Sequence, residues 1–154
     1  MRHGLSLSIV VLSLVHAAAA QDARAQPSGA GTQMERVDGI GGFFFRAKSP
    51  KVLAKWYADH LGVALTPTDY NQRPWRQAAG PTAFQPFPAD SKFFGRPEQM
   101  FMLNFRVRNL DAMVAQLRRA DIAVNVDPQT YPNGRFAQTQ DPEGNPIQLW
   151  QPKT

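Results

Sequence analysis

The segment Phe45-Arg46-Ala47-Lys48-Ser49 recurs 60 residues later as Phe105-Arg106-Val107-Arg108-Asn109, with an aromatic residue, an arginine, a small apolar residue, a base and a helix-capping residue in the same order. An apolar stripe with helical spacing follows each copy. A strand that runs into a capped amphipathic helix is therefore used twice, which predicts two copies of one supersecondary unit related by a pseudo-twofold axis. Such a pair usually encloses a cleft, and we expect the functional site there.

The first copy is expected within about residues 38–88 and should fold as strand, helix and three strands. Ser49 is expected to cap the helix, and Pro50 is tolerated in its first turn because the N–H that proline lacks has no partner there. Gly62 can end the helix in the left-handed conformation. The predicted strands are residues 40–47, 63–66, 75–77 and 82–87.

The second copy is expected within about residues 99–152. Asn109 is expected to cap its helix, which runs to about Ala120, and Asp121 stands where the first copy has its glycine, so this helix end is less well specified. Asp141-Pro142-Glu143-Gly144 has the residue order of a type I turn. The predicted strands are residues 99–107, 123–126, 135–140 and 146–151.

Residues 88–98 join the two copies, and their prolines and glycine predict a loop. This loop carries Phe93, Phe94 and Arg96, an unusual number of rings for a linker. It could close over the cleft, or it could pack against its own domain or a partner, and both interpretations stay open.

Alternation along three strands predicts which side chains face the helices and which face the cleft. One set is apolar throughout and is expected to lie under the helices: Phe43, Phe45, Ala47, Leu103, Phe105, Val107, Ile147 and Leu149. The alternate set is mixed and is expected to line the concave side: Gly42, Phe44, Arg46, Met102, Asn104, Arg106, Gln148 and Trp150.

The first residues are typical of a targeting segment, with a basic head, an apolar run from Leu5 to Ala20 and alanine-rich cleavage sites. They predict a signal peptide over residues 1–20, with a second site that allows cleavage after residue 25, and hence a periplasmic or secreted protein. Residues 21–35 are expected to form a flexible tether and residues 36–152 a single domain. No stable membrane insertion is expected after cleavage, and an uncleaved anchor is the alternative.

Charge and cysteine content limit the function classes. The net charge is +5, but the bases are spread along the chain without a run or an aromatic-interleaved patch. We therefore expect no nucleic-acid partner and a mildly cationic surface that attracts small anions. The chain contains no cysteine, no Gly-x-Ser-x-Gly elbow and no phosphate-binding glycine loop before a helix, so nucleophilic catalysis finds no support.

The tandem module with the ending Asp141-Pro142-Glu143-Gly144-Asn145-Pro146-Ile147-Gln148-Leu149 resembles the vicinal oxygen chelate (VOC) superfamily, which covers glyoxalase I, bleomycin resistance proteins and extradiol dioxygenases. The opening of the first copy, from Phe44-Phe45-Arg46-Ala47 through Trp56-Tyr57-Ala58-Asp59-His60-Leu61-Gly62, looks like the first half of small glyoxalase-like proteins. The likeness covers about residues 37–152. It implies an α+β fold in which tandem βαβββ modules form a curved mixed sheet around a cleft, and it implies a homodimer.

Enzymes of this superfamily generally hold a divalent metal through His, Gln or Glu side chains on the first and last strands of each half. Here those positions fall at Gly42, near Ala83 or Phe84, at Met102 and at Gln148. Glycine has no side chain, methionine is a poor ligand for such ions, and a lone amide does not hold a catalytic metal. We therefore expect no cofactor, and a divalent metal held by other residues is the alternative.

The cleft-facing set supplies the candidate ligand-binding residues, while no residue is identified as catalytic. The arginines suit a carboxylate or phosphate, the amides need partners where they are buried, and the rings and the thioether would supply apolar walls. Solvated rim positions and ordinary core packing remain the competing interpretations. The candidates are Asn104, Arg106, Arg46, Gln148, Trp150, Phe44 and Met102.

The sequence thus predicts an exported glyoxalase-like protein, free of metal, that binds a small organic molecule in its cleft, with an anionic ligand among the options. Whether it is an enzyme stays open, because a metal-dependent lyase, isomerase or dioxygenase of the same superfamily is the first alternative. The second alternative is a protein-interaction module whose cleft is vestigial.

Overall fold

The computed structural model describes residues 34–69 and 71–153. The predicted signal peptide (1–20) and most of the predicted tether (21–35) lie outside these ranges. The chain divides into two units after Gly42, and the described residues of the first unit contain no helix or strand. All the elements that follow belong to the second unit.

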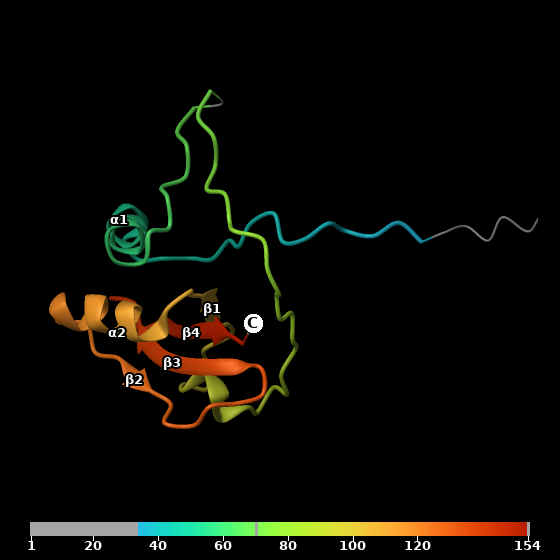
Figure 1. Ribbon diagram of the computed structural model, residues 1–154. Helices are drawn as coiled ribbons and strands as arrows, with labels where there is room; N and C mark the ends of the chain where they lie inside the picture. The colour runs from blue at the N-terminus through green and yellow to red at the C-terminus, as the bar shows by residue number, and fades with distance from the viewer. Residues whose placement is uncertain (1–33, 70, 154) are drawn as a thin grey trace, which may run out of the picture. The chain divides into compact units, whose positions relative to one another are not determined.

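The four strands of the second unit form one mixed, curved, open sheet (Figure 1). They are β1 (Leu103–Arg106), β2 (Asn125–Val126), β3 (Gly134–Gln140) and β4 (Pro146–Pro152). Their order is β1-β4-β3-β2, in which β1 runs parallel to β4 and the other neighbours are antiparallel. Each strand predicted from the second copy is present, although β1 begins later and β2 is shorter than predicted. The predicted fold class is confirmed in its curved mixed sheet with two helices.

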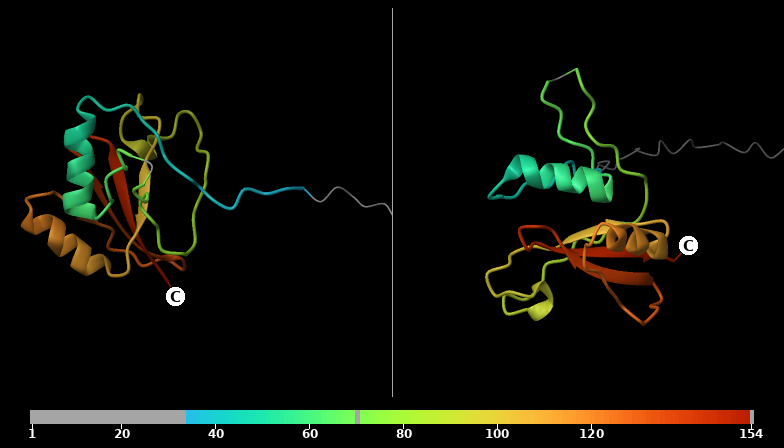
Figure 2. Two further views of the ribbon diagram at one scale, coloured as in Figure 1. Left: turned by 90° about the horizontal axis from the view of Figure 1, so that it is seen from above. Right: turned by 90° about the vertical axis from the view of Figure 1, so that its left-hand side faces the viewer.

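Helices α1 (Pro50–Leu61) and α2 (Leu110–Arg119) lie on the same face of this sheet (Figure 2). Asn109 caps α2 as predicted, because its Oδ1 accepts a hydrogen bond from the Ala112 N–H at 2.9 Å. Gly62 ends α1 with φ 68°, and Asp121 takes φ 57° just after α2, so both exits use the left-handed region. No helix in the described part of the chain is long and apolar enough to cross a membrane.

The start of α1 is stabilised differently from the prediction. Ser49 occupies the N-cap position, but its side chain makes no capping hydrogen bond. The carboxylate of Glu143 instead accepts from the backbone N–H groups of Lys48 and Ser49, both at 2.8 Å. A carboxylate is the stronger acceptor and its negative charge suits a helix N-terminus, so a residue of the β3–β4 turn fixes the start of α1.

The same turn ties α1 to the sheet. The Gly144 N–H donates to the Asp141 carbonyl at 2.9 Å, which confirms the predicted turn. The Asp141 side chain is only 5% exposed, and it accepts from the Tyr57 hydroxyl and the Asn145 amide, each at 2.8 Å. Backbone N–H groups of Glu143 and Asn145 also donate to it, so this buried carboxylate is fully hydrogen-bonded.

The core lies between the two helices and the sheet. It consists of side chains that are almost fully buried: Leu53, Tyr57, Leu110, Val114, Leu117, Ala137, Ile147 and Leu149. The predicted helix-facing positions Phe45, Ala47, Leu103, Phe105 and Val107 pack against this core. Phe43 is the exception, because it stays half exposed, although its ring contacts the rings of Phe45 and Phe101.

The strands predicted in the first copy are wrong. Residues 40–47, 63–66, 75–77 and 82–87 contain no strand, so the first copy contributes α1 alone to the regular elements. Pro67, Pro74 and Pro81 divide this region into short pieces, and each proline removes one N–H from any ladder. Short strands without partners are marginal in water. The described residues therefore form one sheet, and the predicted cleft between two sheets is not present among them.

Candidate functional site

The face of the sheet that points away from the helices carries the polar and aromatic side chains. Asn104 of β1 lies opposite Gln148 of β4, which in turn lies opposite Gln138 of β3. One step along the strands, Arg106, Trp150 and Phe136 are paired in the same way. The loop that contains the short helix η1 (Lys92–Phe94) lies on this side of the sheet (Figure 2).

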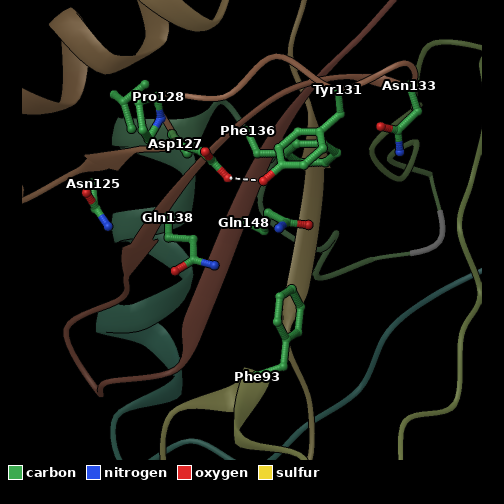
Figure 3. A pocket seen from close by; sticks show the side chains of 11 residues that line it. Phe93, Asn125, Asp127, Pro128, Tyr131, Asn133, Phe136, Gln138 and Gln148 are labelled. Atoms are coloured by element: carbon green, nitrogen blue, oxygen red, sulfur yellow. Dashed lines mark hydrogen bonds between the residues drawn. The ribbon is translucent and has the colours of Figure 1, made fainter.

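This face contains a hollow of about 390 Å³ (Figure 3). Its floor comes from β2, β3 and β4, one end is formed by the loop between β2 and β3, and the other end is formed by Phe93. The lining residues are Phe93, Asn125, Val126, Asp127, Pro128, Tyr131, Asn133, Phe136, Ala137, Gln138 and Gln148. Rings and amides together make a surface that suits an organic molecule with hydrogen-bonding groups.

Asp127 and Tyr131 form the polar end of the hollow. The Tyr131 hydroxyl donates to Oδ2 of Asp127 at 2.9 Å (Figure 3). The Gln129 N–H donates to Oδ1 of Asp127 at 2.9 Å. The hydrogen bond to Asp127 raises the pKa of Tyr131 above its ordinary value, and desolvation and the negative charge of the carboxylate act in the same direction. The phenol therefore stays protonated and holds the carboxylate in place.

A ladder of aromatic rings continues from Tyr131 along the sheet. The Tyr131 ring meets Phe136 edge to face at 5.7 Å, and Phe136 stacks on Trp150 at 6.1 Å with 9° between their planes. The Trp150 indole N–H donates to the Asn133 carbonyl at 2.9 Å, which ties β4 to the loop before β3. The rings therefore have fixed orientations, as a stacking surface requires.

Phe93 lies at the other end of the hollow and packs the loop of residues 88–98 against its own unit. Phe93 lines the hollow, and it also stacks on Phe87 at 5.2 Å with 6° between the planes. At the far end of the loop, Nη2 of Arg96 donates to Oε1 of Gln99 at 2.7 Å. The loop thus places an aromatic wall opposite Tyr131.

Three of the predicted site residues lie together on the open face. Gln148 lines the hollow, and Nδ2 of Asn104 donates to its Oε1 at 2.6 Å. Trp150 stacks on Phe136, which lines the hollow, but Trp150 does not line the hollow itself. Asn104 acts on the hollow through Gln148, since it orients that amide.

The other four predicted residues lie outside the lining. The Arg106 guanidinium donates to the Ala78 carbonyl at 2.7 Å and fills the space where a side chain on residue 80 would lie, which only glycine leaves free. Arg46 is exposed, and Phe44 is 94% exposed. Met102 is half-buried just before β1 and does not contribute to the hollow.

Four residues that line the hollow were not predicted from the sequence: Asp127, Tyr131, Phe136 and Gln138. Phe136 and Gln138 could have been found, because the alternation applied to the other strands assigns them to the open face of a strand at 135–140. Asp127 and Tyr131 follow a short strand within a loop, and no periodic pattern places a loop over a sheet.

The residues at the superfamily's metal positions do not fit a metal ion. Gln148 is the one oxygen donor among them, and its Oε1 already accepts from Asn104. Among residues 34–69 and 71–153, no group of three or more His, Asp or Glu side chains is placed to hold a metal ion.

A family model for the glyoxalase-like domain matches residues 42–150. TnmS3, an antibiotic binding protein from Streptomyces sp. CB03234, is 30% identical over 68% of this chain and 88% of its own, with a TM-score of 0.43. A glyoxalase/bleomycin resistance protein from the same strain is 36% identical over 37% of this chain and 50% of its own, with a TM-score of 0.31.

A glyoxalase-family candidate from Bacillus anthracis is 25% identical over 36% of this chain and 44% of its own, with a TM-score of 0.32. This chain therefore spans about half the length of the Bacillus anthracis protein and of the Streptomyces glyoxalase/bleomycin resistance protein. Among curated proteins, none matches this chain. The TM-scores are low, so the sequence match over residues 42–150 carries the comparison.

Proposed function

Because this chain belongs to the glyoxalase-like domain family, we propose that it binds a small organic molecule in the hollow on the open face of its sheet. The observation that carries the proposal is the hollow itself, whose volume of about 390 Å³ lies within the range of roughly 300–1,000 Å³ usual for small-molecule sites. The Gln138 and Gln148 amides supply hydrogen bonds, and the Tyr131, Phe136 and Phe93 rings supply stacking area.

The proposed binding requires no metal ion. The hollow offers amide and ring surfaces, which recognise an organic molecule by shape and hydrogen bonds. A lyase, isomerase or dioxygenase would need a metal held by other residues, and this is the outcome that competes with the proposal. The second competing outcome is a protein partner bound to the open face.

The proposal extends to the export of the protein and to its oligomeric state. We propose that residues 1–20 direct export to the periplasm or beyond, which rests on their sequence pattern alone. We also propose a homodimer, supported by Phe44, Phe84 and Met100, which are large apolar side chains exposed in the second unit. Light scattering on the purified protein tests the dimer, and N-terminal sequencing of the protein recovered from the periplasm tests export.

A matched pair of variants tests the binding site. Gln138 and Gln140 both point from β3 to the open face, but only Gln138 lines the hollow. Thermal unfolding is measured with a library of small organic molecules, with and without added divalent metals. A ligand at 100 times its dissociation constant should stabilise the wild type by about 2.7 kcal/mol.

The same stabilisation is expected for Gln140→Leu and is expected to be strongly reduced for Gln138→Leu. Equal losses in both variants would place the ligand elsewhere. Stabilisation by a metal ion alone would favour the enzyme, and a library without any effect would favour the interaction module.

A further inference from the structure

The hollow has an uneven charge distribution. Among the described residues that line it there is one carboxylate, Asp127, and no arginine, lysine or histidine. The arginines of the neighbouring strands are engaged elsewhere, because Arg106 donates to the Ala78 carbonyl and Arg135 pairs with Asp111 at 2.8 and 2.9 Å. The protein has a net charge of +5, yet the one charged side chain among the described residues that line this hollow is a carboxylate.

Asp127 is held in place and still has free acceptor capacity. Each of its oxygens accepts one hydrogen bond, from the Gln129 N–H and from the Tyr131 hydroxyl. A carboxylate has about four acceptor positions, so roughly two remain for a ligand. Asp127 is half-buried, and an N–H donor that reaches it is partly shielded from water, which strengthens a charge-assisted hydrogen bond.

Aromatic rings lie next to this carboxylate. The Tyr131 hydroxyl is hydrogen-bonded to Asp127, and the centres of the Tyr131 and Phe136 rings lie 5.7 Å apart. The faces of such rings attract cations and stack on planar groups. An anion would meet both the Asp127 charge and these electron-rich faces, so it is disfavoured twice.

Granting the binding function proposed above, we infer that the hollow selects an organic cation: a planar or aromatic molecule that carries an ammonium or amidinium group. The charged N–H group donates to Asp127, and the ring lies against Phe136 and Tyr131. The amides of Gln138 and Gln148 remain available to polar groups on the rest of the molecule. This charge preference is opposite to the anionic ligand that the net charge of the chain suggested.

Three probes of almost equal shape test this inference by isothermal titration calorimetry on the full chain at neutral pH and low salt. They are 2-naphthylmethylammonium, 2-naphthylmethanol and 2-naphthoate, which are cationic, neutral and anionic. We expect the ammonium to bind about tenfold more tightly than the alcohol, as a charge-assisted hydrogen bond warrants, and the naphthoate to bind most weakly. This ranking needs no variant, so it stands even if a substitution prevents folding.

Asp127→Asn should reduce ammonium binding about tenfold and leave the alcohol almost unchanged. Asp59→Asn is the matched control, because it removes the same charge from an exposed residue of α1 that pairs with Lys55 outside the hollow. It should bind all three probes like the wild type.

Equal binding of the three probes, or the tightest binding by naphthoate, would overturn the inference while leaving the binding function intact. The same conclusion follows if Asp127→Asn and Asp59→Asn weaken the ammonium equally. If none of the probes binds, the library screen decides whether only the charge preference is wrong or the proposed binding function is wrong as well. A library ligand that Gln138→Leu loses would refute only the charge preference, and the absence of any ligand would refute both.

Discussion

Replacing Tyr57 with phenylalanine removes one buried oxygen and leaves the ring in place. The hydroxyl of Tyr57 donates to Oδ2 of Asp141 at 2.8 Å, and both side chains are almost completely buried. A hydrogen bond to a charged group is worth about 1.5–3 kcal/mol, and no cavity forms because only the hydroxyl is lost. We expect Tyr57→Phe to lower the free energy of unfolding by about that amount.

The assay is equilibrium urea unfolding at neutral pH, followed by tryptophan fluorescence and circular dichroism. The midpoint should fall while the slope with denaturant stays the same, since the surface exposed on unfolding hardly changes. Tyr131→Phe is the matched control, because it removes a tyrosine-to-aspartate hydrogen bond of similar length between two half-buried residues. A more exposed bond contributes less, so its effect should be clearly smaller.

A double-mutant cycle isolates the energy of the hydrogen bond between Tyr57 and Asp141. In the background of Asp141→Ala the hydroxyl has lost its acceptor, so Tyr57→Phe should cost little there. The reasoning would be refuted if Tyr57→Phe were as mild as Tyr131→Phe, or if the two substitutions at Tyr57 and Asp141 were simply additive.

Two further predictions concern pH and backbone conformation. Burial, followed by the hydrogen bond to Asp141, raises the pKa of Tyr57 above its ordinary value of 10.0. The stability that the protonated Tyr57 contributes should therefore be intact below pH 10.0 and lost as the pH rises above it. The free energy of unfolding measured against pH should show a smaller alkaline loss in Tyr57→Phe than in wild type, and equal losses would contradict this. Gly134 has φ 133°, and a Cβ on it would meet the Gln151 carbonyl and the Trp150 indole. Gly134→Ala should therefore destabilise the fold by about 2 kcal/mol or more and change the near-ultraviolet dichroism of Trp150. A Cβ on Gly41 would meet nothing within 4 Å, so Gly41→Ala should leave the stability and the dichroism unchanged.

The second copy of the repeat could be predicted because local signals decide its elements. The Asn109 cap, the helical stripe and the period-two alternation of β1 and β4 all concern residues close in sequence. The same alternation placed Asn104 and Gln148 on one face of the sheet, where Nδ2 of Asn104 donates to Oε1 of Gln148. These predictions depend only on chain geometry, and they held.

The features of the fold and of the candidate site that could not be predicted depend on contacts between residues distant in sequence. The start of α1 is fixed by Glu143, which is 94 residues beyond Ser49, and no local rule connects the two. The strands expected between residues 63 and 87 lack partners, and strand formation depends on a partner rather than on the sequence of one segment. Asp127 and Tyr131 were missed for the related reason that a loop reaches the sheet through tertiary packing.

The bond between Tyr57 and Asp141 spans 84 residues, and this separation has a consequence for the order of folding. During synthesis α1 emerges well before Asp141, the buried acceptor of Tyr57, and before Glu143, the carboxylate that holds its first turn. The long loop closed by these contacts slows their formation. The start of α1 and the Tyr57 hydroxyl therefore stay without these partners until the β3–β4 turn has been synthesised, so α1 reaches its final environment only late in folding.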